Sequence, residues 1–166
     1  RDYKVTGVQT CALPISPLQP RPAMSDALID ALIDRLQSAV PGLRLVAGAA
    51  GFAAASESNP PATPAAYVFL TGESGGEGAI DDGTDIQRID SSLSVVLVVR
   101  HVGAAAGAGA AGDLQPLSEA VKAALRGFAP TAEHDPMRFE SAALLAFRDR
   151  HEWWQQAWKS ACYEGV

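Results

Sequence analysis

The chain has 166 residues, with 13 basic and 19 acidic side chains and a formal net charge of −6. This acidic balance excludes a protein that binds nucleic acid through a broad basic surface, because such binding depends on lysine and arginine displacing counterions from phosphates. Apolar residues make up 48% of the chain, yet no unbroken apolar run approaches the roughly 20 residues of a membrane-spanning helix. The sequence therefore predicts neither a membrane partner nor a sequence-specific nucleic-acid partner.

The first 23 residues differ in kind from the rest. Residues 5–16 (VTGVQTCALPIS) resemble the in-frame translation of a common sequencing adapter. A secretory signal is the rival interpretation, but residues 11–18 contain two prolines and no sustained apolar stretch. We therefore predict that residues 1–23 are an artefactual, disordered extension and that residues 24–166 form one domain.

That domain has 143 residues, enough to bury a core without covalent crosslinks. It keeps 10 basic residues after the loss of Arg1, Lys4 and Arg21, and 18 acidic residues after the loss of Asp2, so its formal charge is −8. Cys162 is its single cysteine, which rules out an intrachain disulfide and predicts a reducing compartment.

The domain opens with a predicted amphipathic helix. Ser25 and Asp26 are favourable N-cap residues, Pro41-Gly42 ends the helix, and the apolar residues between them recur every three or four positions. Asp26, Asp30 and Asp34 form an acidic row, which we interpret as a solvated helix face and not as a metal site.

The middle of the chain predicts strands separated by loops. Strands are expected at residues 43–46, 67–71 and 86–102, the last of them buried on both faces at residues 95–99. A short helical turn fits residues 51–57, and the glycine-rich, acidic residues 72–83 predict a mobile loop. Residues 103–112 contain only glycine and alanine and predict a flexible connection, followed by a second amphipathic helix from Asp113 to about Gly127.

The C-terminal residues 139–164 predict a β-hairpin with a polar turn at residues 148–152. Alternation places Trp154, Trp158 and Cys162 on one face and Trp153 and Tyr163 on the other. Together these elements predict an α+β fold, with a mixed, mostly antiparallel sheet of about five strands and two main helices on one face.

No pattern in the sequence predicts an enzyme, a cofactor or a metal. Gly107, Gly109 and Gly112 form a literal dinucleotide-binding spacing, but four residues separate it from the preceding strand and Asp113 would repel a pyrophosphate. The acidic residues 81–85 lack the later glutamate of a calcium loop. The three histidines are scattered singly, and no serine lies in a nucleophile elbow.

The hairpin tryptophans have two open interpretations. Trp153, Trp154 and Trp158 can be ordinary core residues of the strand. Alternatively, because aromatic residues lie on both faces, one face can be closed by another subunit, and Tyr163 then joins the three tryptophans as an interface candidate.

The order of elements from residue 24 onward carries a resemblance. An amphipathic helix is followed by the strands 64–68 (PAAYV) and 95–99 (VVLVV), a second helix, and a hairpin with FRD at its turn and WWQ after it. These features resemble bacteriophage tail terminator proteins, also called tail-completion proteins, over most of the chain.

The resemblance implies a structural protein of a phage or prophage, made in the bacterial cytoplasm and located in the virion tail. Such proteins form rings, typically hexameric, that cap the head-proximal end of the tail tube, end its polymerisation and allow the head to join. The implied partners are further copies of the chain, the tail tube protein and the head–tail connector protein. Other ring components, such as a head-closure or tube protein, and a small nucleotide-binding enzyme remain alternatives.

Overall fold

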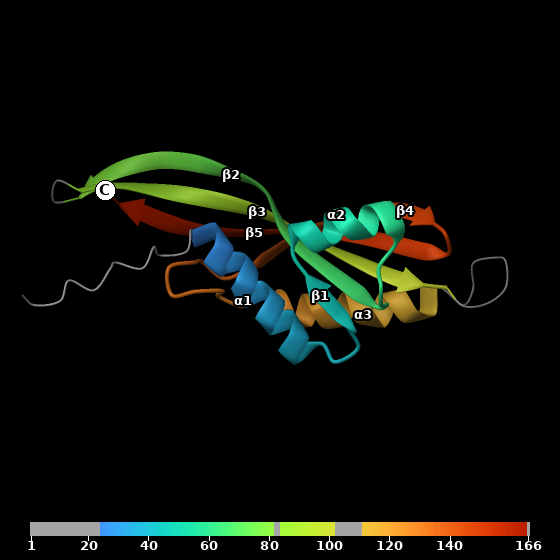
Figure 1. Cartoon of the computed structure of the whole chain (residues 1–166). Coiled ribbons are helices and arrows are strands. Elements are labelled where there is room, and N and C mark those ends of the chain that lie inside the picture. Colours follow the sequence, from blue (N-terminus) through green and yellow to red (C-terminus); the bar gives the residue numbers. More distant parts are fainter. Residues whose placement is uncertain (1–23, 82–83, 102–110, 166) are drawn as a thin grey trace, which may run out of the picture.

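A computed structural model describes residues 24–81, 84–101 and 111–165 (Figure 1). Three helices and five strands occur in the order α1 (Met24–Ala39), β1 (Leu45–Ala47), α2 (Ala49–Ser58), β2 (Ala65–Asp81), β3 (Thr84–Arg100), α3 (Ala111–Leu125), β4 (Arg138–Arg148) and β5 (His151–Gly165). Within these ranges, no helix is long and apolar enough to cross a membrane. Residues 1–23, which we predicted to be an artefactual extension, lie outside the described residues.

The five strands form one sheet in the order β1-β2-β3-β5-β4. β1 pairs with β2 in parallel, and the other three pairings are antiparallel. The predicted α+β fold with a mixed, mostly antiparallel sheet is therefore confirmed.

One face of the sheet is covered by α1 and α3, as predicted. Leu28, Leu32 and Leu36 of α1 are fully buried, and they belong to one apolar cluster with Val95 and Leu97 of β3. The spacing of the leucines explains their burial, since residues four apart lie above one another on a helix. The periodicity read from the sequence therefore identifies the helix face that meets the sheet.

The opposite face is covered by α2, which is longer than the predicted helical turn. Its Phe52 lies 4.7 Å from the Phe69 ring and meets Tyr67 edge-on at 6.0 Å, measured between ring centroids. Val96 and Val98 of β3 complete this second cluster. A helix on each side of β3 explains why residues 95–99 are buried on both faces.

The prediction of a mobile loop at residues 72–83 is wrong for the residues that the structure describes. β2 continues to Asp81 and pairs with β3 from Thr84, with two register shifts on the way. Glycine permits a close approach here: a Cβ atom at Gly75 would lie 2.6 Å from Nε2 of Gln87, which donates to the Gly76 carbonyl at 3.1 Å. Backbone pairing with β3 outweighed the poor strand propensity of the glycines.

This extension forms a three-stranded arm, made of residues 72–81 of β2, 84–92 of β3 and 159–165 of β5. Figure 1 shows the arm projecting beyond the helices, with the C-terminal end of β5 near its tip. A flexible connection was predicted at residues 103–112. Residues 103–110 lie outside the described residues, and Ala111 and Gly112 form the start of α3.

Candidate subunit interface

The C-terminal hairpin has a tighter turn than the sequence indicated. β4 ends at Arg148 and β5 begins at His151, so only Asp149 and Arg150 form the connection. Both have positive φ, 49° and 62°, as a two-residue type I′ turn requires. Asn59 after α2 donates a hydrogen bond to Oδ2 of Asp149 at 3.2 Å, which ties the turn to the body.

Trp158 is a core residue on the face covered by α1 and α3. It is 0% exposed, and the Phe139 ring meets it edge-on at 5.4 Å. Its Nε1 donates to Oε1 of Gln156 at 3.2 Å, and the Gln156 amide donates to the Ser118 hydroxyl of α3 at 2.9 Å. The polar groups of Trp158 and Gln156 are thereby paired, whereas the buried Nε1 atoms of Trp153 and Trp154 on the same strand have no hydrogen-bond partner among the described residues. Trp158 offers no surface to a second subunit.

Trp153 is a core residue on the α2 face. It is 2% exposed, its ring lies edge-on to Phe52 at 6.1 Å, and the Arg148 guanidinium lies 4.8 Å from its ring centroid. Arg148 also donates to the carbonyls of Ala55 and Ser56 near the end of α2. Trp154, on the other face, is partly buried against the α1–α3 cluster.

Tyr163 lies in the arm and is 56% exposed. Arg88 donates to its hydroxyl at 3.3 Å and places its guanidinium 5.8 Å from the ring centroid. Of the four interface candidates, Trp153 and Trp158 are buried in the core. A core position was one of the two roles that the sequence left open for the tryptophans. Tyr163 and part of Trp154 remain accessible, and their contact with a neighbour stays a prediction.

Sequence reasoning missed the strongest candidate for an interface, which is β4. Leu144, Leu145 and Phe147 are 55%, 47% and 61% exposed, and with Tyr163 they are the large apolar side chains most exposed within the described residues. β4 pairs only with β5 among the described strands, so its outer backbone edge is free. A long edge strand that exposes apolar side chains is a typical association surface. The signal was available in residues 142–147 (AALLAF), where apolar residues occupy both faces of a strand.

The other side of the sheet has a free edge as well. β1 pairs with β2 only from Ala65 to Tyr67, so the outer edge of β2 is uncovered beyond that point. A hollow of about 610 Å³ opens there between α1, the start of α2 and β2. It is lined by Ser25, Asp26, Ile29, Asp30, Ala49, Val68, Phe69 and Leu70.

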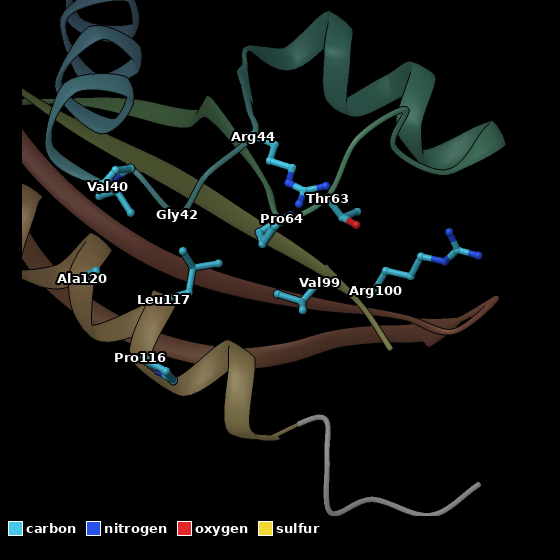
Figure 2. Close-up of a pocket in the computed structure, with 11 residues that line it drawn as sticks. Val40, Gly42, Arg44, Thr63, Pro64, Val99, Arg100, Pro116, Leu117 and Ala120 are labelled. Atoms are coloured by element: carbon cyan, nitrogen blue, oxygen red, sulfur yellow. The ribbon is translucent and has the colours of Figure 1, made fainter. Parts of the chain in front are cut away.

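A second cavity, of about 660 Å³, lies between the end of α1, the segment before β2, the end of β3 and the start of α3. Figure 2 shows Arg44 and Arg100 on one side of it and Leu117, Val99 and Pro64 along its wall. Among the described residues, its lining includes no carboxylate, thiol or imidazole that could act as a general base or a nucleophile.

The titratable groups buried near the arm are held in their neutral forms. Burial raises the pKa of the Cys162 thiol, which keeps it protonated and weakly reactive. Burial lowers the pKa of His134, whose Nδ1 lies 2.8 Å from the Thr131 hydroxyl. Within the described residues, no three histidine, cysteine, aspartate or glutamate side chains could jointly hold a metal ion.

Comparison with known proteins identifies the family. The model of the phage tail terminator protein family matches residues 24–164, which is most of the chain. No curated protein matches the sequence. The family implies a location in the virion tail and interaction with other tail components. The chain therefore belongs to the phage tail terminator protein family and is a structural protein of the phage tail.

Proposed function

We propose that the protein closes the head-proximal end of the tail tube as a homo-oligomeric ring, a hexamer, and so ends polymerisation of the tube. The observation that carries this proposal is the family match over residues 24–164. It is supported by the free β4 edge, where apolar side chains stay exposed in the single chain and gain burial when copies associate.

A ring forms when one patch of a subunit meets a different patch on the next and the rotation closes. The two free sides of this sheet provide two such patches in each copy. The faces of the ring then remain available to two further partners, the tube protein on one side and the head–tail connector protein on the other. The protein, encoded by a phage or prophage, is made in the bacterial cytoplasm and completes the tail during virion assembly.

The negative charge of the chain is compatible with this role. With 13 basic and 19 acidic side chains, the protein lacks the basic surface that would hold DNA by counterion release. A lumen with the same sign of charge as DNA would let the genome pass without binding to the ring.

The test combines sizing with tube assembly. We expect the full chain to have the mass of a ring in light scattering, and to stop growth when added to polymerising tube protein. Electron microscopy should then show the ring at one end of each tube. The proposal fails if the chain is monomeric at every concentration while tubes elongate normally in its presence. Binding along the whole tube wall would favour a different tube component.

A further inference from the structure

We infer that the β4 edge of one copy binds the hollow beside β2 of a second copy, in a head-to-tail contact. This inference rests on the proposed ring and names the joint between its subunits. It follows from the exposed apolar side chains and the charged groups at each of the two sheet edges.

The β4 edge is apolar and basic. Leu144, Leu145 and Phe147 project their side chains into solvent. Arg138 and Arg150 are exposed and have no ion-pair partner within the described part of the chain. The carboxylate of Glu140 on this strand is already neutralised by Lys159 at 2.6 Å. The exposed Asp149 beside Arg150 carries one negative charge and accepts a hydrogen bond from Asn59, and Arg148 adds a third positive charge. Three arginines against one carboxylate without an ion pair leave this edge basic around its exposed apolar stretch.

The hollow beside β2 is apolar and acidic. The partly buried Ile29 of α1 and Phe69 and Leu70 of β2 supply its accessible apolar lining, since Val68 is fully buried, and the exposed residues Asp26 and Asp30 supply its carboxylates. No ion pair holds either aspartate in the residues that the structure describes. The acidic row that the sequence analysis assigned to a solvated face thus borders a concave apolar surface.

The charges favour a head-to-tail contact over a twofold contact between two β4 edges. Two β4 edges would bring like charges together, which costs free energy, whereas β4 against the hollow pairs arginine with aspartate. In the sheet order, β3 and β5 separate β2 from β4, so each copy offers both surfaces at once. Figure 1 shows the N-terminal end of α1, which borders the hollow, lying well away from β4. A contact between two different patches is the kind that closes into a ring.

Charge exchange provides the first test. We expect Arg150→Asp, and separately Asp30→Lys, each to raise the subunit dissociation constant about tenfold, because each places like charges across the contact. Aspartate is chosen at position 150 because it tolerates the positive φ of that residue. The two substitutions in one chain should return the dissociation constant to near the wild-type value. Thermal melts of all three variants control for folding.

Site-specific crosslinking provides the second test. In a Cys11→Ser background, chains carrying Leu145→Cys and chains carrying Leu70→Cys should form a disulfide when mixed, and neither should crosslink alone. Crosslinking of Leu145→Cys with itself would show a twofold contact and overturn the inference.

The two proposals fail separately. Rings that cap tubes but show neither the charge rescue nor the mixed crosslink would overturn this joint and leave the proposed function intact. Chains that crosslink as expected but leave tube growth unchanged would support the joint and overturn the proposed function. A chain that stays monomeric at every concentration and lets tubes elongate normally would overturn both.

Discussion

β4 and β5 are the two halves of one hairpin and both are rich in apolar residues, yet their surroundings differ. β5 pairs on both sides, with β3 and β4. Phe52 of α2 contacts it on one face and Ser118 of α3 on the other, and Trp153 and Trp158 are buried. β4 pairs on one side only, and Leu144, Leu145 and Phe147 stay in contact with solvent. Position in the sheet, and not composition, decides whether an apolar side chain stabilises the fold or remains available for association.

The largest effect should come from the centre of β5. Trp158→Ala removes a fully buried aromatic side chain and leaves a cavity, so we expect a loss of about 3–5 kcal/mol in the free energy of unfolding. Urea denaturation measures it. Leu144→Ala on β4 is the matched control, and we expect it to change stability by less than about 1 kcal/mol. Similar losses for both variants would contradict the contrast between the strands.

A smaller effect should come from the polar group beside Trp158. Gln156→Ala leaves the Trp158 Nε1 and the Ser118 hydroxyl without the partner that they have in the structure. The expected cost is about 1–3 kcal/mol in the free energy of unfolding, because buried polar groups lose their hydrogen bonds. Ser118→Ala, which removes only one partner, should cost less in the same measurement. The reverse ranking would show that Gln156 does not organise this part of the core.

The pH dependence of stability should depend on His134. Burial lowers its pKa, with partial compensation by the carboxylates of Glu133, Glu73 and Asp135. Its neutral form is favoured in the folded state, so this contribution is fully present above the unfolded pKa of about 6.5 and is lost as pH falls toward the folded value. The urea midpoint should therefore drop between about pH 7 and pH 5, and drop less in His134→Gln. An identical drop in both chains would rule out His134 as the cause.

The smallest effect on stability, but a clear effect on association, is expected on the β4 edge. Leu145→Ser should change the free energy of unfolding by less than about 1 kcal/mol, since the side chain is 47% exposed. In sedimentation it should shift the oligomer towards monomer. Ala143→Ser, at another exposed position of the same strand, is the control and should sediment as wild type. Loss of folding in Leu145→Ser would instead place that residue with the core.

The fold was predictable wherever a local pattern determines burial. The leucine spacing of α1, the alternation around residues 95–99 and the apolar runs of the hairpin led to the observed helices, sheet and layer arrangement. The continuation of β2 to Asp81 was missed, because glycine-rich residues have no strand preference of their own and are ordered by pairing with β3.

The candidate interface was less predictable for a related reason. The sequence left the three tryptophans open between core packing and a subunit interface, because aromatic residues are enriched in both, and the structure buries Trp153 and Trp158. Exposure of Leu144 and Phe147 follows from β4 being the last strand of the sheet, and strand order is a long-range property. The sequence pattern of residues 142–147 indicates an apolar strand, but it does not show that the strand lies at the edge of the sheet, with a neighbouring strand on one side only.

The pairing of β3 with β5 differs from its neighbours in having no register shift. It runs through fifteen residue pairs, from Ile86 opposite Gly165 to Arg100 opposite His151, whereas the β2–β3 and β4–β5 ladders each have two irregularities. Its hydrogen bonds lie across the strand direction. A pull along the strands therefore loads the whole ladder in shear instead of opening it one pair at a time. This uninterrupted ladder is therefore the part of the sheet that we expect to resist a pull between the arm and the body most strongly.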